Sequence, residues 1–386
     1  MKRIKKINKV YKDTAILNYR MSQIVILGAG DGGLTSANEL QRLLGEKHKI
    51  ILIDKRKKYH LGLTKLWVMI GKRLPEECER EISNVEKKGI RFVNDEVVKI
   101  NIEEKKVYTT TNYFKYDYLI IALGADVSLN SISGFKDGAL NLYDINSVHQ
   151  IYQEIEKFYR GNILILIPRT PFKCPAAPYE ACFLLDDYFR KKGRRESIKI
   201  TICTSEPHPL PSAGRDCGVM MSNMLSSRDI SLRCGVKVIS IDNQRKVVLF
   251  ENENEERFDL LIGVPVHSSP VVVKEFTNEN NWIPVDKNTL KTSTQNVYAI
   301  GDVSGIKLSN GVLLPKSGVF AEEQAKVVAF NIIAEINETN DKKEFDVLVF
   351  HPLQTYEWVE FREKTGVKVI RRGLFDENNK LTSGFQ

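Results

Sequence analysis

Several features are missing from the 386-residue sequence, and each absence removes a class of protein. No stretch approaches the ~20 consecutive apolar residues that a membrane-spanning helix needs, and no apolar segment of signal-peptide length follows the basic first residues. The six cysteines include no C-x-x-C pair and no His/Cys cluster with the spacing of a zinc site. We therefore expect an intracellular protein without a metal centre or a disulfide framework, attached to a membrane at most by its surface.

Length and charge place the chain among multi-domain soluble proteins. Its length exceeds what one core usually holds, so two or three domains are expected. The net charge is +8, and residues 1–20 hold seven Lys or Arg against one Asp. Such an arm can bind nucleic acid or an anionic membrane surface, but a disordered lead-in is the more common case. We expect residues 1–21 to be a basic extension, and we expect no nucleic-acid partner.

A strand, a glycine-rich turn, a helix and a second strand follow one another from Ser22. Residues 23–27 form a short apolar run rich in β-branched side chains, residues 34–44 have apolar residues at helical spacing, and residues 49–53 are again apolar. This order is typical of a βαβ unit whose strands are parallel and buried.

The turn in this unit carries three glycines with separate physical tasks. Gly28 permits a tight turn, Gly30 lets a pyrophosphate approach the backbone, and Gly33 lets the helix pack close to the strand. The helix N-terminus then offers N–H groups to the anion. Asp54 ends the second strand, where a carboxylate can accept hydrogen bonds from ribose hydroxyls. We predict a dinucleotide site formed by Gly28, Ala29, Gly30, Gly33, Asp54 and Lys55.

An internal repeat indicates two related domains. Residues 97–108 and residues 236–249 each read as a small antiparallel meander, and an aromatic-Asp pair and a buried strand follow each of them. We predict an α/β fold of two Rossmann-like dinucleotide-binding domains, each with an inserted antiparallel meander. The predicted parts are a discontinuous first domain at 22–126 and 268–336, a second domain at 127–267, and a small C-terminal region at 337–386 with three strand-like segments.

The far end of the chain separates FAD from NAD as the cofactor. An apolar strand at 297–300 ends in Gly301 and Asp302. In two-domain flavoproteins an aspartate at this point holds the ribityl chain of the flavin. Together with the turn at 122–124, which ends in Gly124, this feature makes FAD the predicted cofactor.

The chain resembles the flavoproteins with two dinucleotide-binding domains of the pyridine nucleotide-disulfide oxidoreductase superfamily. Within it, the chain is most similar to sulfide:quinone oxidoreductase and to the flavoprotein subunit of flavocytochrome c sulfide dehydrogenase. The resemblance runs from Ser22 to about Phe375. It rests on residues 171–180 (Pro-Phe-Lys-Cys-Pro-Ala-Ala-Pro-Tyr-Glu), 263–265 (Gly-Val-Pro) and 315–322 (Pro-Lys-Ser-Gly-Val-Phe-Ala-Glu). It implies that Cys174 is the redox cysteine and that Lys316 and Gly318 begin a helix that contacts the flavin.

The loop around Cys174 stands where NADH-using relatives carry a second glycine fingerprint. After the apolar strand at 162–167 the loop has no glycine and three prolines, so its backbone cannot cradle a second pyrophosphate in the usual way. NAD(P)H is therefore not the expected electron donor. Cys174 precedes a predicted helix, whose dipole, together with Lys173, favours the thiolate. A cysteine outside a disulfide is most often a small buried apolar residue, but the specific local match favours a redox role.

The resemblance also gives Lys316 a role. It places this residue near the pyrimidine edge of the flavin, where positive charge stabilises the anionic reduced ring. The alternative is a solvated lysine. A cation at a helix N-terminus is electrostatically unfavourable without an anionic partner, so we predict that Lys316 acts with the cofactor.

The family pattern breaks at its second cysteine. The sulfide-oxidising relatives carry that cysteine where this chain has Glu357, and no cysteine occurs after Cys234. One option is that Cys174 acts alone, through a persulfide whose sulfur passes to a small external thiol or to sulfide. Another is that Cys182 or Cys217 takes the second place, although Cys182 lies about 12 Å along the predicted helix from a partner at its start. A third is that the substrate is not sulfide.

We expect an FAD-dependent oxidoreductase that takes electrons from a reduced sulfur compound through Cys174 and passes them to a quinone. Trp358 and Phe361, or residues 319–320, could line a quinone pocket. His208 and His267 lie in predicted loops and could act as acid-base groups, although such a histidine is more often merely solvated.

Two other readings stay open. One is an enzyme like type II NADH:quinone oxidoreductase, and the other is a flavoprotein subunit or redox sensor that acts only with a protein partner. We expect a cytoplasmic protein, with peripheral contact to the inner face of the cell membrane as a further option. The sequence does not indicate the oligomeric state.

Overall fold

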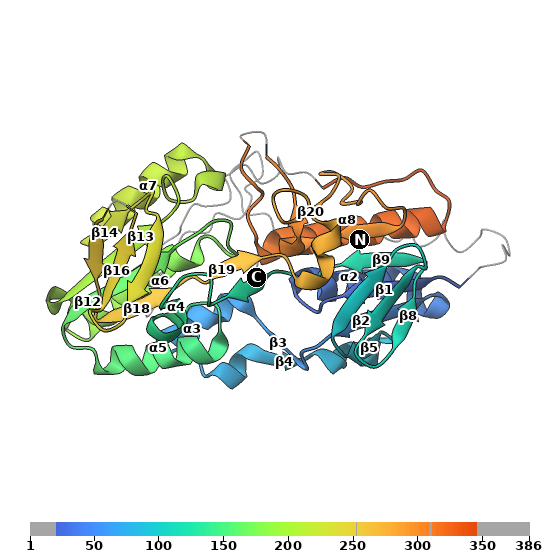
Figure 1. Cartoon of the computed structure of the whole chain (residues 1–386). Helices are drawn as coiled ribbons and strands as arrows, with labels where there is room; N and C mark the ends of the chain where they lie inside the picture. The colour runs from blue at the N-terminus through green and yellow to red at the C-terminus, as the bar shows by residue number, and fades with distance from the viewer. Residues whose placement is uncertain (1–20, 252, 309–310, 346–386) are drawn as a thin grey trace, which may run out of the picture.

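The computed structural model describes residues 21–345, apart from residues 252 and 309–310. Two units lie side by side, each built on its own parallel sheet (Figure 1). The predictions for residues 1–20 and for everything after residue 345 fall outside the described residues. These predictions include the C-terminal strand segments, Glu357, Trp358 and Phe361.

The first unit has a five-stranded sheet in the order β21-β9-β1-β2-β5, and all its strand pairs are parallel. The sheet joins two distant parts of the chain, because β21 is the strand next to β9. Its strands are β1 (Gln23–Leu27), β2 (Lys49–Asp54), β5 (Arg91–Asn94), β9 (Tyr118–Ile121) and β21 (Val297–Ala299).

Alternate residues of these strands pack into two separate hydrophobic cores. Ile24 and Ile26 pack with helices α2 (Asp31–Leu44) and α8 (Gly318–Ile336), whereas Val25 and Leu27 pack with the meander on the other face. This arrangement follows from the period of two in a strand, which sends neighbouring side chains to opposite faces. The meander strands are β6 (Val97–Asn101), β7 (Lys106–Thr109) and β8 (Tyr113–Lys115), and they pair antiparallel.

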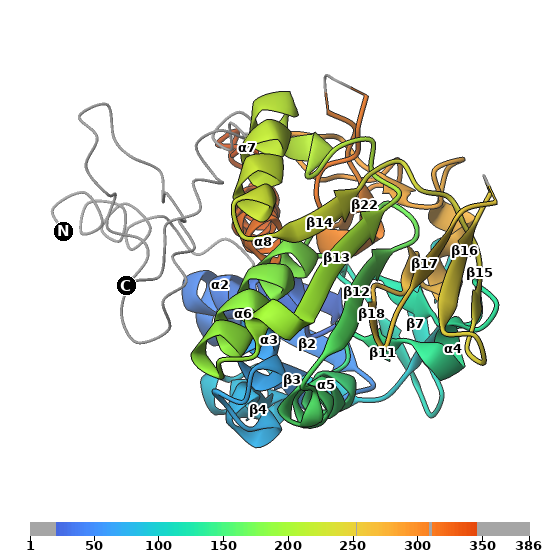
Figure 2. The same ribbon diagram turned by 90° about the vertical axis from the view of Figure 1, so that its left-hand side faces the viewer.

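The second unit repeats this plan. Its parallel sheet has the order β11-β18-β12-β13-β14, and its antiparallel meander has the order β15-β16-β17. Figure 2 shows helices α6 and α7 on one side of this sheet and the meander on the other. The strands and helices are β11 (Leu140–Asn141), α5 (Ile145–Lys157), β12 (Gly161–Ile167), α6 (Ala177–Lys191), β13 (Ile198–Thr204), α7 (Arg215–Ser226), β14 (Ile230–Arg233), β15 (Val238–Asp242), β16 (Val247–Phe250), β17 (Glu255–Arg257) and β18 (Leu260–Gly263).

The predicted α/β fold of two Rossmann-like units with inserted meanders is therefore confirmed. The exact domain boundaries stay a prediction. The chain passes between the units through β10 (Asp126–Ser128) and β19 (Val266–Ser268), which pair antiparallel. In Figure 1 β19 lies between the two units.

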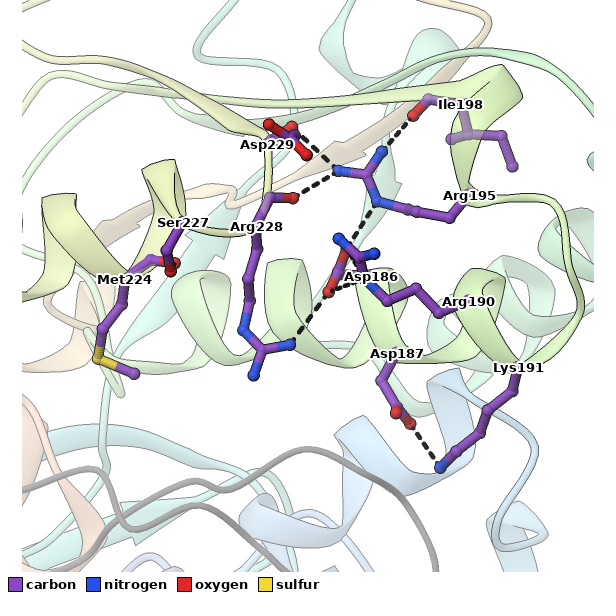
Figure 3. A network of polar contacts seen from close by, with 10 residues as sticks. All are labelled: Asp186, Asp187, Arg190, Lys191, Arg195, Ile198, Met224, Ser227, Arg228 and Asp229. Carbon is purple, nitrogen blue, oxygen red and sulfur yellow. Dashed lines mark hydrogen bonds and ion pairs between the residues drawn. The ribbon is translucent and has the colours of Figure 1, made fainter.

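One buried carboxylate ties the helices of the second unit together. Asp186, on α6, is fully buried and accepts hydrogen bonds from Arg190, Arg195 and Arg228 (Figure 3). Arg195 also donates to the carbonyl oxygens of Ile198, Arg228 and Asp229. The network joins the end of α6 to the segment after α7, and it fixes the scaffold on which the loop before α6 is held.

Candidate functional site

The glycine turn has the shape that the sequence predicted. Gly28 has φ +93°, and a Cβ there would lie 2.3 Å from the carbonyl oxygen of Ala122. A Cβ on Gly33 would lie 1.8 Å from the carbonyl oxygen of Gly28, so both positions exclude a side chain. Gly30, the N-terminal cap of α2, is different, because a Cβ there would meet nothing within 4 Å. The open space beside Gly30 is the space that a ligand at the helix N-terminus would use.

The starts of α2 and α8 meet beside this space. A Cβ on Gly318, the first residue of α8, would lie 2.4 Å from a carboxylate oxygen of Asp31 at the start of α2. The backbone N–H of Gly301 donates to the side-chain oxygen of Gln324 at 2.7 Å, which fixes the end of β21 against α8. The structure therefore brings Gly30, Gly301 and Gly318 to one place, although 288 residues separate the first from the last. Gly124 lies in the turn after β9, with φ +71°.

Asp54 is buried and already has a partner. Its carboxylate accepts from the N–H of Ala29 at 2.6 Å and from the backbone and guanidinium of Arg56 at 2.7–3.0 Å. Burial works to raise the pKa of Asp54, but the bonds from Arg56 outweigh it and hold the pKa below its ordinary value. A carboxylate offers about four acceptor sites, so a ribose hydroxyl would have to share or replace a bond from Arg56, whose side chain is half exposed.

Lys55 points elsewhere. Its ammonium pairs with Glu96 at 3.0 Å, and both side chains are exposed. The predicted site included Lys55 and left out Arg56, although Arg56 is the residue in contact with Asp54. The sequence spacing could have indicated Arg56, since a cation two residues after a buried carboxylate at a strand end can form an ion pair with it.

Asp302, which is half-buried, and Lys316, which is buried, lie close to each other. Asp302 follows β21, and burial raises the pKa of its carboxyl group against the opposing charges of Lys173 and Lys316. Lys316 is 4% exposed, its Nζ donates to the carbonyl oxygen of Ser304 at 2.9 Å, and it lies 3.6 Å from the centre of the Trp282 ring. Burial lowers the pKa of Lys316 to about 7, although Asp302 works against this. A lysine held this way is partly a neutral amine near pH 7, and an anion beside it would favour the protonated, charged form.

Cys174 lies in the loop before α6 and is joined to the segment before α8. Its N–H donates to the carbonyl oxygen of Lys316 at 2.5 Å, and its own carbonyl oxygen accepts from the N–H of Ala177 at the start of α6. Cys174 has φ +49°, a conformation that costs a non-glycine residue about 1–2 kcal/mol and that concentrates at functional sites. The structure thus brings together Cys174 and Lys316, which lie in different units and 142 residues apart.

Three further side chains, those of Lys65, Tyr143 and His267, lie near Cys174, and no sequence motif indicated the first two. Lys65, at the start of α3 (Lys65–Met69), donates to the carbonyl oxygen of Tyr143 at 2.6 Å, and the hydroxyl of Tyr143 donates to the carbonyl oxygen of Cys174 at 3.4 Å. The rings of Tyr143 and His267 meet edge to face at 5.4 Å. Burial and the charge of Lys173 lower the pKa of Lys65 to about 8. Neither Lys65 nor Tyr143 belongs to a motif that could have revealed it.

His267 was named as an acid-base candidate in a loop, and the loop assignment is wrong. It lies in β19, is 8% exposed, and pairs in register with Val127. Its Nδ1 lies 2.8 Å from the carbonyl oxygen of Pro265, and its Nε2 is buried without a hydrogen-bond partner among the described residues. Burial and the charge of Lys173 lower the pKa of His267 to about 3, so the ring is neutral at ordinary pH.

The structure argues against the two cysteines considered as partners for Cys174. Cys182 lies inside α6 and is fully buried, and burial raises the pKa of its thiol far above the ordinary value. Cys217 lies in the first turn of α7, where burial raises its thiol pKa to about 11. Thiols of this kind are poor nucleophiles. None of the six cysteines, all of them in the described part of the chain, forms a disulfide.

The second unit has its own strand-end carboxylate, and it is covered. Glu206 follows β13, as Asp54 ends β2 in the first unit. It is 2% exposed and accepts hydrogen bonds from the hydroxyls of Tyr179 at 2.5 Å and Thr204 at 3.0 Å. Burial raises the pKa of Glu206 to about 7. Tyr179, from the first turns of α6, therefore occupies the place from which a second nucleotide would reach this acid.

A groove of about 520 Å³ runs along α7, away from these residues. It is lined by Asp216, Val219, Met220, Asn223, Met224 and Ser227, none of which belongs to the site described above. Chemistry that needs a thiol, a lysine and a glycine turn cannot take place there. The candidate site is therefore the region between the units, around Gly30, Asp302, Lys316 and Cys174.

Comparison with known proteins gives consistent relatives. The family model described as pyridine nucleotide-disulphide oxidoreductase matches residues 22–166 and 183–325. A mitochondrial sulfide:quinone oxidoreductase of Mus musculus is 26% identical over 309 residues, which are 74% of this chain and 66% of the mouse protein. A type II NADH:quinone oxidoreductase of Staphylococcus haemolyticus is 24% identical over 328 residues, which are 80% of this chain and 81% of that protein.

Solved structures agree on the fold. The X-ray structure of the sulfide:quinone oxidoreductase from Aquifex aeolicus superposes with a TM-score of 0.75 at 24% identity, and the match covers 83% of this chain and 78% of that one. The match to the mouse protein leaves about a third of that protein's length without a counterpart here.

Proposed function

Because the chain belongs to the pyridine nucleotide-disulphide oxidoreductase family and is an FAD-dependent oxidoreductase, we propose that it oxidises a reduced sulfur compound at Cys174 and passes the electrons through FAD to a quinone. The proposal has three parts, which are the cofactor site, the sulfur chemistry and the acceptor.

We assign the FAD site to the residues where α2 and α8 begin. The open space at Gly30 and the helix N-terminus beside it suit the pyrophosphate. Asp302 is a half-buried carboxylate to which no described residue donates a hydrogen bond, so it suits the hydroxyls of a ribityl chain. Asp54 with Arg56 suits the adenosine end, and Gly28, Ala29, Gly33, Gly124, Gly301 and Gly318 shape the walls. The residues present therefore fit FAD, which supplies a two-electron acceptor when it is bound.

Cys174 is the proposed sulfur nucleophile. Its thiolate and the sulfur of a hydrosulfide donor form one S–S bond, the proton of the hydrosulfide is released, and the two electrons lost by the sulfur atoms pass to FAD as the oxidant. The product is a persulfide on Cys174, and a small thiol or a second sulfide then attacks the outer sulfur and restores the thiolate. This scheme needs one cysteine, which agrees with the absence of any cysteine after Cys234.

One observation carries the proposal. The hydrogen bond from the N–H of Cys174 to the carbonyl oxygen of Lys316 joins the cysteine loop of one unit to the start of α8 in the other. Lys316 lies next to Asp302 and the proposed flavin site. A cysteine held in this way would lie beside the proposed cofactor site, which supports electron transfer from sulfur at Cys174 to FAD.

The second unit offers little to a nucleotide. The loop after β12 contains Pro168, Pro171 and Pro175 in place of glycines, and the carboxylate of Glu206 lies beneath Tyr179. A dinucleotide would have to displace Tyr179 and would still lack a backbone cradle. These features support a sulfur donor over NAD(P)H.

The quinone acceptor is proposed from the relatives. The names of the mouse and Staphylococcus proteins both include a quinone as acceptor. Quinones with long tails reside in membranes, so we propose that the chain contacts a membrane surface peripherally. Among residues 21–345, as far as the structure describes them, no helix combines the length and apolar character needed to cross a bilayer.

A type II NADH:quinone oxidoreductase activity is the second candidate, and the likeness to the Staphylococcus protein favours it. A flavoprotein that works only with a protein partner is the third, motivated by the missing second cysteine.

Anaerobic titration of the FAD-loaded protein separates the candidates. We expect sulfide to bleach the flavin absorbance, a soluble quinone to restore it, and NADH to leave it unchanged. Prompt bleaching by NADH would establish the second candidate. Bleaching by sulfide without reoxidation by any quinone would favour the third, because the acceptor would then be a protein.

A further inference from the structure

Two lysines lie around Cys174 with few counter-charges. Lys65 is held over the site by its 2.6 Å hydrogen bond to the carbonyl oxygen of Tyr143, whose hydroxyl contacts the backbone of Cys174. Lys173 precedes Cys174, and its backbone pairs with that of Lys316 in a parallel bridge. The charges of Cys174 and Lys173 both act on Lys65, so the three groups are neighbours.

The other charged groups nearby balance this positive charge only in part, since Asp302 faces Lys173 but also faces Lys316. Arg56 also faces Lys65 but is neutralised by Asp54. Asp144 is a carboxylate that faces Lys65, and it is exposed and serves as the N-terminal cap of α5. Two cations that repel each other across a partly buried space lower their energy when an anion enters it.

A second observation also indicates a ligand in this region. His267 is more than nine-tenths buried, packs against Tyr143 and feels the charge of Lys173. A carbonyl oxygen can only accept a hydrogen bond, so the Nδ1 beside Pro265 must carry the ring proton. The Nε2 is then an acceptor, and no described residue donates to it. A buried acceptor left in this state destabilises the fold unless a ligand supplies a donor.

We propose that Lys65 and Lys173 form an anion-binding site over Cys174 that selects a small anionic sulfur species, with His267 Nε2 as the acceptor for its S–H hydrogen. Hydrosulfide and hydropolysulfide carry both a negative charge and an S–H group, whereas a neutral thiol or a bulky cationic thiol does not. This inference rests on the proposed function, since it names the charge of the substrate at the same cysteine. Lys65 acts as a specificity-determining residue and does not itself react.

The cofactor is the other possible source of the anion. The phosphates or the reduced ring of FAD could neutralise the two lysines, and the site would then have no charge left for a substrate. The two sources differ in one measurable respect: a site used by the cofactor loses its attraction for a second anion when FAD is bound.

Charged thiol reagents test the site directly, with or without catalysis. The probes are two methanethiosulfonates of similar size, one with a sulfonate group and one with a trimethylammonium group. The thiolate of Cys174 attacks the sulfenyl sulfur, an S–S bond forms and methanesulfinate leaves. The rate at Cys174 is followed by peptide mass spectrometry in the FAD-loaded and FAD-free protein, with Cys174→Ser as the blank.

We expect the anionic reagent to react faster than the cationic one in both forms. Lys65→Gln keeps a hydrogen-bond donor for Tyr143 but removes the charge, so it should reduce the anion-to-cation rate ratio by about tenfold, from a Coulomb interaction across roughly 6 Å of partly screened space. Lys65→Arg should restore the ratio, and Lys157→Gln on the exposed end of α5 should leave it unchanged.

Three results would overturn the inference. A ratio near one in the FAD-loaded wild type would show that no anion site exists over Cys174. A ratio that favours the anion only without FAD would assign the lysines to the cofactor. A Lys65→Gln ratio equal to that of the wild type would remove Lys65 from the site. None of these depends on flavin reduction by sulfide, so failure of the inference and failure of the proposed function are distinguishable.

Discussion

A methyl group added at Gly30 should separate folding of the protein from binding of its cofactor. Gly30 has φ −83° and ψ −169°, which alanine adopts without strain, and its added Cβ would touch nothing within 4 Å. The same methyl would fill the space through which a pyrophosphate approaches the start of α2. Gly30→Ala is therefore harmless to the empty protein and harmful to the complex.

The structure gives the size of both effects. A glycine replaced by alanine in a compatible conformation gains about 0.4–1 kcal/mol through the unfolded state, which raises the unfolding temperature by about 1–3 °C in a chain of this size. On the other side, losing one hydrogen bond to a charged phosphate costs about 1.5–3 kcal/mol. The dissociation constant for FAD should then rise roughly 10- to 100-fold.

Thermal unfolding of the FAD-free protein and a fluorescence titration with FAD measure the two effects. Gly33→Ala is the contrasting variant, because its Cβ would lie 1.8 Å from the carbonyl oxygen of Gly28, and it should lower the unfolding temperature even without FAD. If Gly30→Ala binds FAD as tightly as the wild type, the pyrophosphate does not lie at Gly30 and the assignment of the cofactor site is wrong.

Other predictions concern buried groups away from the glycine turn. Burial in the folded protein raises the pKa of Glu206 from 4.5 to about 7, so the folded state favours the protonated acid. The free energy of unfolding, measured by chemical denaturation, should therefore fall by about 2–3 kcal/mol as pH rises through this interval. Glu206→Gln should flatten that pH dependence, and an unchanged slope would refute the assignment. His267→Phe removes an acceptor without a partner, so the unfolding temperature should stay equal or rise while flavin reduction by sulfide slows; a fall in stability with normal reduction would make His267 a purely structural residue. Asp186→Ala leaves three arginines without their common carboxylate and should cost about 3–5 kcal/mol, and a loss below about 1 kcal/mol would contradict the network in Figure 3.

The parts of the fold that follow from local patterns were predictable from the sequence. The first βαβ unit, both meanders and the start of α8 each have a periodicity or a motif of their own, and the structure contains them. Some helix ends in the structure differ from the predicted ends, because the capping residues and not the apolar spacing determine where a helix begins. Helix α2 begins at Asp31, three residues before the apolar spacing starts, since the glycine-rich first turn has no side chains to show a helical pattern.

The surroundings of Cys174 were not predictable, because they depend on how the two units meet. Lys65 comes from a short helix, and Tyr143 comes from the segment between β11 and α5, so no spacing in the sequence relates either to Cys174. His267 was predicted as an acid-base candidate because it was taken for a loop residue, whereas its chemical state is decided by its burial in β19. Glu206 could have been found, since it follows β13 as Asp54 ends β2, but only contact with Tyr179 shows that it is covered.

The central claim is that a sulfur atom is oxidised on Cys174 with FAD as the electron acceptor. The direct measurement is peptide mass spectrometry of the FAD-loaded protein after anaerobic reaction with one equivalent of sulfide, with the flavin absorbance recorded in the same sample. The account predicts that Cys174 gains the mass of one sulfur atom as the flavin is bleached, and that Cys174→Ser does neither. Bleaching by sulfide at the wild-type rate in Cys174→Ser would contradict it.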